Sequence, residues 1–123
     1  ERARSILDRH EEDVLAAWRE RFGSLEAQGL ATTSLDDVAV AASNAAIDEL
    51  LFDLESETEG TIDDRGRLER AETPGPDSTV LVDEIAARVL RTGGTVRAAR
   101  GDDMIAGSPV AATLRFPLDQ MAT

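Results

Sequence analysis

Apolar residues recur along the first segment of the chain with the period of a helix. They follow one another at intervals of seven, four, four and three residues, and charged residues fill the positions between them. This spacing places the apolar side chains on one face of a helix that we expect over residues 3–22, with Gly23 and Ser24 as its end. The residues of that face are Leu7, Val14, Trp18, Phe22 and Leu25.

Two further segments show the same period. One is predicted to be a helix over residues 34–46, begun by a capping box of Ser34 and Asp37, with alanines on its buried stripe so that it packs closely against a sheet. The other is predicted over residues 79–91, capped by Asp77 or Ser78 and ended by Gly93 in a left-handed conformation. Its expected buried face consists of Val82, Ile85, Ala86, Val89 and Leu90.

Short apolar runs between these helices are typical of strands. Three strands are expected, over residues 48–55, 95–99 and 110–116. Residues 56–78 form an acidic connection, in which a small hairpin is predicted over 60–68 with its turn at Asp63 to Gly66. The order of elements predicts one α/β domain, in which helices cover both faces of a small sheet and residues 48–99 form a right-handed parallel crossover.

Charge is distributed unevenly along the 123 residues. The chain has 25 acidic and 13 basic residues, every base is arginine, and ten of the twelve excess negative charges lie in residues 34–78. Such a segment repels phosphate backbones, so nonspecific nucleic-acid binding is disfavoured. Within it, the acidic residues 53–77 suit either a solvated loop or a docking surface for a basic partner.

Composition also excludes several classes of site. The absence of cysteine excludes disulfides, thiolate metal sites and a cysteine nucleophile. No stretch approaches the ~20 apolar residues of a membrane span, so the expected location is the cytoplasm. Because the chain opens on Glu1 and a helical pattern starts at once, we expect it to be part of a longer protein.

Few residues are candidates for chemistry, and we assign none of them a catalytic role or a cofactor. His10 has only ordinary helix charges beside it, and Ser108 lacks the spacing of a hydrolase elbow. The pairs Asp63-Asp64 and Asp102-Asp103 offer oxygen ligands for magnesium or calcium, without the alternating spacing of a calcium loop. Acids in turns usually bind nearby backbone.

Four arginines near the end of the third helix and in the next strand are the other candidates. If Arg88, Arg91, Arg97 and Arg100 gathered on one surface, they could bind an acidic protein, a phosphate or RNA. The alternative is that Arg88 and Arg91 only solvate the helix and stabilise its C-terminal dipole. Aromatic residues for stacking on bases amount to only 3% of the chain, which favours this alternative. Asp63 and Asp64 complete the set of candidate partner-binding residues.

Several segments of the sequence resemble one protein family. They resemble, in this order, segments of the third, C-terminal domain of archaeal and eukaryotic class-1 release factors and Pelota. The segments are Ala45 to Phe52, Val82 to Ile85 followed by Leu90 to Val96, and Val110 to Phe116, and the last of them is similar to the closing strand of bacterial relatives. The resemblance covers residues 3–118. The sequence departs from the family at Ala45, where glycine is common, and in the connection 56–78, which has no cysteines for a zinc ion.

This resemblance implies a three-layer α/β/α sandwich with a small mixed sheet, similar to kink-turn RNA-binding ribosomal proteins. The family's hydrolytic Gly-Gly-Gln loop belongs to another domain and is missing here. The implied function is therefore a non-catalytic protein-interaction domain of a bacterial release-factor-like or ribosome-rescue translation factor, which docks on a translational GTPase or the ribosome through the full-length protein. The alternatives are an RNA-binding module of the kink-turn type and a divalent-metal-dependent enzyme.

Overall fold

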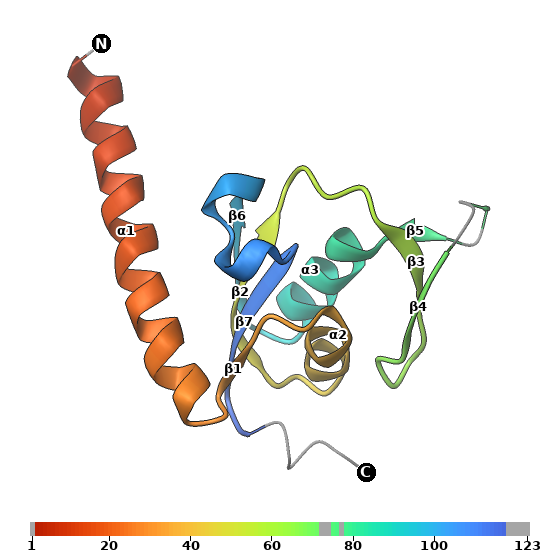
Figure 1. Cartoon of the computed structure of the whole chain (residues 1–123). Helices are drawn as coiled ribbons and strands as arrows, with labels where there is room; N and C mark the ends of the chain where they lie inside the picture. Colours follow the sequence, from red (N-terminus) through yellow and green to blue (C-terminus); the bar gives the residue numbers. More distant parts are fainter. Residues whose placement is uncertain (1, 72–74, 77, 118–123) are drawn as a thin grey trace.

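A mixed four-stranded sheet lies at the centre of the molecule, with helices on both of its faces (Figure 1). The computed structural model describes residues 2–71, 75–76 and 78–117. In this part of the chain the helices are α1 (Arg2–Ala27), α2 (Leu35–Ser43) and α3 (Leu81–Arg91). The strands are β1 (Ala31–Thr32), β2 (Ile47–Asp53), β3 (Glu59–Ile62), β4 (Leu68–Arg70), β5 (Thr79–Val80), β6 (Thr95–Ala99) and β7 (Val110–Leu114).

The strand order of the central sheet is β1-β7-β2-β6. β7 runs antiparallel to both β1 and β2, whereas β2 and β6 are parallel, with Leu51 opposite Arg97. The parallel pair is the one expected from the crossover through α3. Every residue of β7 is buried, so this strand needs cover on both faces. A second, smaller sheet of order β4-β3-β5 contains the predicted hairpin.

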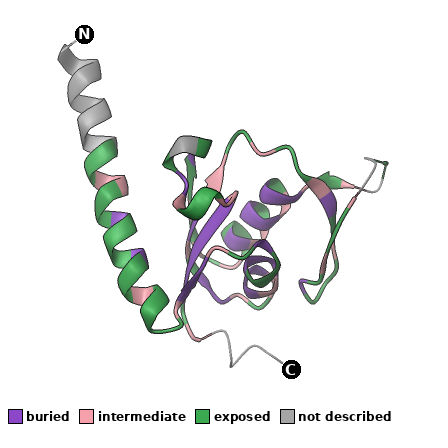
Figure 2. Ribbon diagram, viewed as in Figure 1, coloured by how far each residue is buried: buried purple, intermediate pink, exposed green. Residues whose placement is uncertain are grey.

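On one face of the central sheet, α2 and α3 bury the larger part of the core. The alanines of α2 allow the close approach that the sequence predicted, and Ala39, Ala41 and Ala42 are all buried. Figure 2 shows that the buried positions gather on the central strands and on the inward sides of these two helices. The core residues on this face include Val38, Ile47, Leu50, Leu81, Ile85, Val89, Val110 and Ala112.

On the other face, α1 makes a smaller contact through its C-terminal half. Trp18 and Phe22 stack with ring centroids 5.5 Å apart, and they pack with Leu51, Ala99 and Ala111 of the sheet. The Trp18 Nε1–H donates to a Glu49 carboxylate oxygen on β2 (2.6 Å), and Arg21 donates to both oxygens of the same carboxylate (2.8 Å). Towards its N-terminal end, α1 diverges from the sheet and projects past it (Figure 1).

The first helix continues five residues beyond its predicted end. Gly23 and Ser24 lie inside α1, because Leu25 still packs against the Trp18 cluster and so favours continuation of the helix. The chain turns instead at Gly29, whose φ is +77°. The following strand β1, which pairs with β7, was not predicted, since two residues are too few to show an alternating pattern.

The second helix begins as predicted and ends earlier. The Ser34 hydroxyl accepts from the Asp37 N–H (3.3 Å), which is one half of the expected capping box. The other half is absent, because the Ser34 N–H donates to Thr32 Oγ1 (3.1 Å) and not to the Asp37 side chain. α2 then ends at Ser43, with Asn44 as its C-cap, because Ala45 adopts a φ of +58° and turns the chain into β2. This left-handed conformation is one that glycine adopts more readily than alanine.

The predicted start of the third helix is wrong. Thr79 and Val80 pair with β3 as β5, so the N-cap of α3 is Val80, without a side-chain cap. The Ser78 hydroxyl instead donates to Glu59 Oε1 (2.9 Å) and accepts from the Gly75 N–H (3.0 Å), and Asp77 lies outside the described residues. At the other end of α3, Gly93 has the expected positive φ, +86°.

The sandwich leaves one large side chain of α3 in water. Leu90 was expected on the buried face, but it is 62% exposed, because the face is centred on Ile85 and Val89 and the next residue lies about 100° further round the helix. None of the helices described is both long and apolar enough to cross a membrane.

Phe22 should be critical for the attachment of α1. Phe22→Ala removes a fully buried ring from a small cluster and should lower the free energy of unfolding by about 4 kcal/mol in urea titrations. Leu54→Ala, at an exposed position, is the matched control and should change it by less than ~0.5 kcal/mol. Equal effects of the two variants would contradict the packing of α1 on the sheet.

Candidate functional site

The structure brings four of the six candidate partner-binding residues into one region. The hairpin turn carries Asp63 and Asp64, and the C-terminal half of α3 carries Arg88 and Arg91, with Ser43 of α2 beside them. We call this region the hairpin junction. It joins elements that are far apart in the sequence, so its geometry depends on how the hairpin is held against the two helices.

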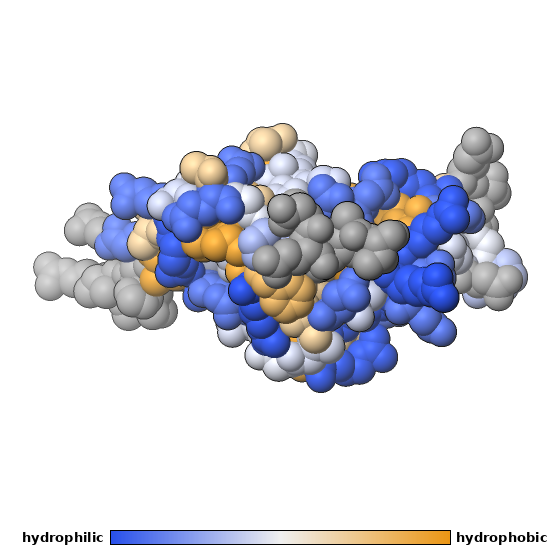
Figure 3. All heavy atoms as spheres, turned by 90° about the horizontal axis from the view of Figure 1, so that it is seen from below, coloured by the Kyte–Doolittle hydropathy of each residue, from blue (hydrophilic) through white to orange (hydrophobic). Residues whose placement is uncertain are grey.

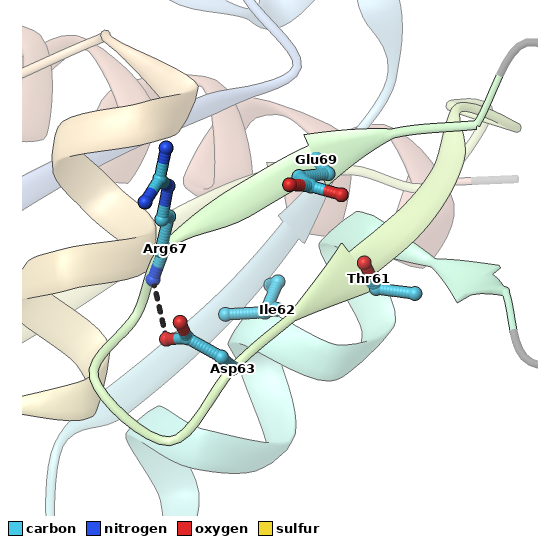
Figure 4. Close-up of a pocket in the computed structure, with 5 residues that line it drawn as sticks. All are labelled: Thr61, Ile62, Asp63, Arg67 and Glu69. Carbon is cyan, nitrogen blue, oxygen red and sulfur yellow. Dashed lines mark hydrogen bonds between the residues drawn. The ribbon is translucent and has the colours of Figure 1, made fainter.

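The turn is organised by the Asp63 carboxylate. Its Oδ1 accepts hydrogen bonds from the backbone N–H groups of Arg65 and Arg67 (2.9 Å each), the second of which is drawn in Figure 4. The backbone N–H of Arg67 is the largest influence that holds the pKa of Asp63 below its ordinary value, followed by those of Arg65 and Gly66 and by the charge of Arg65, while desolvation opposes them. The carboxylate is thus engaged with its own turn, which is the ordinary role of an aspartate at such a position.

Gly66 allows this turn to lie directly on α2. Its φ is +93°, and a Cβ atom built on it would come within 2.6 Å of the Val40 Cα and 2.7 Å of the Ala39 carbonyl oxygen. Both facts exclude a side chain without a shift of the backbone.

Arg88 fastens the hairpin to the helices from the other side. Its side chain is only 16% exposed, and its guanidinium donates to the carbonyl oxygens of Ile62 (2.8 Å) and Asp63 (2.7 Å) and to the Ser43 hydroxyl (2.6 Å). Its Nε donates to Glu84 one turn earlier on α3 (3.1 Å). These contacts are internal, so Arg88 acts here as a structural clamp. Arg91 also binds Glu84 (3.3 Å), but it is 68% exposed.

Two hollows lie beside the clamp among the described residues. One, of about 240 Å³, is lined by Thr61, Ile62, Asp63, Arg67 and Glu69 (Figure 4). The other, of about 210 Å³, is lined by Ala42, Ser43, Asp64, Arg88, Arg91 and Thr92. Both are smaller than the roughly 300 Å³ at which small-molecule sites begin. The hairpin junction therefore suits contact with a macromolecular surface better than enclosure of a small substrate.

The other two candidate arginines lie elsewhere. Arg91 precedes β6, whereas Arg100 follows the far end of that strand. Arg97, in the middle of β6, stands opposite Leu51 on the sheet face that α1 covers, and α3 covers the other face. The four arginines thus do not gather on one surface.

The remaining sequence candidates that the structure describes have ordinary local partners. Among the described residues, no group of three acidic or histidine side chains converges as a metal site. Asp103 pairs with Arg19 (3.8 Å), and the Ser108 hydroxyl donates to the Thr33 carbonyl oxygen (2.6 Å). The side chains of His10 and Asp102 lie outside the described part of the structure.

Two features of the surface were missed by sequence reasoning. The outer edge of β6 carries no neighbouring strand in the described structure, and Leu54 and Leu90 are each 62% exposed. The helical period of α3 could have indicated that Leu90 is exposed, since Leu90 directly follows the buried Val89. The open edge had none, because strand order is a property of the tertiary structure.

Solved structures provide the informative comparisons. The C-terminal domain of the peptide chain release factor from Methanosarcina mazei is 19% identical, with a TM-score of 0.62 over 92% of this chain and 90% of that one. Pelota from Archaeoglobus fulgidus is 21% identical, with a TM-score of 0.65 over 93% of this chain. This chain spans about a third of the length of that protein. The fold is therefore that of the release-factor and Pelota C-terminal domain.

Sequence comparisons add nothing to this result: no protein-family model matches the chain, and no curated protein is significantly similar to it.

Removal of the clamp should loosen the hairpin. Arg88→Ala leaves the carbonyl oxygens of Ile62 and Asp63 without a charged donor, and we expect a loss of about 3 kcal/mol in the free energy of unfolding, measured by urea denaturation. Arg91→Ala removes a bond to the same Glu84 from an exposed side chain and should cost less than ~0.5 kcal/mol. Equal losses of unfolding free energy in the two variants would contradict the role of Arg88 as a clamp.

The Asp63 turn should make stability depend on pH in one direction. Because its folded pKa lies below the ordinary 3.8, the stabilisation is present above pH ~4 and is lost as the pH falls through the folded pKa. Asp63→Asn keeps a neutral acceptor, so the variant should be less stable than the wild type near pH 7 and should converge with it in acid. Asp63→Ala has no acceptor for these N–H groups, so it should be less stable than the wild type in acid as well. Unfolding curves across pH test this, and a difference that is constant with pH contradicts it.

Proposed function

We propose that this chain is a non-catalytic docking domain of a translation factor similar to release factors and Pelota, of the bacterial release-factor-like or ribosome-rescue kind, acting in the cytoplasm. The observation that carries the proposal is the agreement of nearly the whole chain with one domain of those proteins, over 92% of its own length and 90% of the release-factor domain. A likeness of this extent concerns the complete domain rather than a shared local motif.

The character of the surface supports docking rather than catalysis. The polar groups of the hairpin junction are engaged with backbone and with one another, as Arg88 and Asp63 show. Catalytic groups need free acceptors or donors aimed at a substrate position. In the described residues, the shallow hollows beside these groups offer no such position.

The partner at the hairpin junction would be a protein surface with basic character. Residues 34–78 contain thirteen of the 25 acids, and their three arginines all lie in the hairpin, so the excess of acid surrounds the hairpin. Complementary charge steers such an encounter and sets its orientation. A translational GTPase or a ribosomal protein is the partner class that the fold suggests. Asp63, Asp64 and Arg91 mark the proposed contact, and Arg88 holds it in shape from within.

RNA binding of the kink-turn type is the alternative. The net charge of −12 opposes it, and the candidate arginines lie at separate places in the fold. A mobility-shift titration at low salt decides between the two, because an RNA-binding module gives a shift that falls steeply with added salt.

Co-sedimentation with ribosomes tests the proposed function. The chain is centrifuged with ribosomes, with and without translational GTPases and a non-hydrolysable guanine nucleotide, and we expect it in the pellet. Asp64→Arg, at an exposed position of the hairpin turn, should reduce the pelleted fraction severalfold, because it reverses a charge at the contact.

The matched control is Glu26→Arg, which makes the same charge change at an exposed position of α1, away from the hairpin. It should pellet like the parent chain. The proposal fails if the parent chain stays in the supernatant under all conditions. Equal losses in the two variants would mean that overall charge, not the hairpin junction, controls binding.

A further inference from the structure

The outer edge of β6 is open in the described structure. β6 pairs only with β2, and the Leu54 N–H donates to the Ala99 carbonyl oxygen (2.8 Å), so the backbone groups of Ala99 face β2. Alternate residues of a parallel strand bond to the same neighbour. The N–H and C=O groups of Val96 and Ala98 therefore point outward, where no described strand receives them.

The two faces of this edge differ in chemistry. Val96 packs against the core under α3, and Ala98, two residues on, lies on the same face and is exposed. Arg97 lies on the opposite face and is exposed. A strand that added to this edge would thus meet apolar side chains on one face and a positive charge on the other.

Exposed leucines extend the apolar face. Arg88 points towards α2 and the hairpin, and Leu90 lies two residues, or about 200°, round α3 from it, on the flank that faces the β6 side of the sheet. Leu54 follows β2 and is bonded to the end of β6. Both are 62% exposed, and they are the large apolar side chains most exposed in the described structure. By contrast, the face seen in Figure 3 is mostly hydrophilic, with apolar residues in small separate areas.

Two arginines lie at β6 itself, Arg97 in the strand and Arg100 directly after it. The other arginines of residues 85–101, Arg88 and Arg91, lie on α3 and bind Glu84. Among the described side chains, none forms an ion pair with Arg97 or Arg100. Of the acids near this strand, Glu49 binds Trp18 and Arg21, Asp53 accepts from the Glu55 N–H (2.8 Å), and Glu55 accepts from the Gly101 N–H (3.4 Å).

We propose that the β6 edge binds an extended acidic segment of a partner protein, which adds a strand to the central sheet. Backbone bonds to Val96 and Ala98 would supply affinity. Alternate side chains of the segment would be apolar, against Leu90 and Ala98, and acidic, towards Arg97, with Arg100 just beyond the end of β6. A second copy of this chain fits poorly, because antiparallel pairing of two β6 edges would bring like charges together. The inference does not rest on the proposed function, since the edge needs no ribosome.

Fluorescence anisotropy with a labelled peptide tests the inference. The probe is a short blocked peptide of alternating valine and glutamate, and the matched probe carries lysine in place of glutamate. We expect the glutamate peptide to bind at least about tenfold more tightly than the lysine peptide, because like charges oppose the latter. By hydrogen-exchange NMR, the glutamate peptide should slow exchange of the Val96 and Ala98 amides.

Two variants address the edge itself. Ala98→Pro removes only an outward N–H and should weaken binding about threefold to tenfold, whereas Ala98→Val keeps that donor and should bind like the wild type. Arg97→Glu should weaken binding about tenfold. If Ala98→Pro fails to fold, as seen by circular dichroism, Arg97→Glu and the exchange data still decide.

Several results would overturn the inference. They are equal affinity for the two peptides, unchanged binding in Arg97→Glu, and exchange that slows only away from β6. A wild-type dimer in sedimentation that Arg97→Glu strengthens would assign the edge to a second copy. An RNA mobility shift that Arg97→Glu abolishes would assign it to nucleic acid.

Discussion

The fold depends on one constraint: β7 is buried at every position, so both faces of the sheet around it must be covered. The chain meets this constraint by unequal means. On one face, α2 and α3 supply a large apolar contact. On the other, a single helix covers the sheet with a small cluster centred on Trp18 and Phe22, which is reinforced by the bonds from Trp18 and Arg21 to Glu49. The strand that lies farthest from β1, β6, has no further strand beside it in the part of the chain that the structure describes.

Periodicity predicted most of this architecture because apolar residues repeat clearly in the long elements. The bounds of β6 agree with those predicted, and the hairpin lies where the sequence placed it. Prediction failed where a tertiary partner decides the local structure. Gly23 did not end α1 because Leu25 still finds a partner, and Ser78 did not cap α3 because β5 pairs with β3 first. No local pattern contains those partners.

The candidate site shows the same limit more sharply. Asp63 and Asp64 could be placed in a turn from local residues alone, because turn chemistry is local. Whether an arginine faces solvent could not be predicted from local residues, because it depends on which groups the fold places opposite its side chain. Arg88 meets two carbonyl oxygens and a hydroxyl from elements at least 25 residues away in the sequence, and it becomes a clamp. Arg97 meets no described carboxylate and remains on the surface.

The charged residues of this chain therefore have two different roles. In the hairpin junction, Asp63 and Arg88 bind backbone groups and fix the shape of the surface around the turn. Around β6, Arg97 and Arg100 have no ion partner among the described side chains, next to a strand edge without a described neighbour. The β6 edge and the hairpin junction lie on opposite flanks of α3, so the two proposed contacts use different parts of the surface. Two partners bound as proposed would therefore not compete for the same residues.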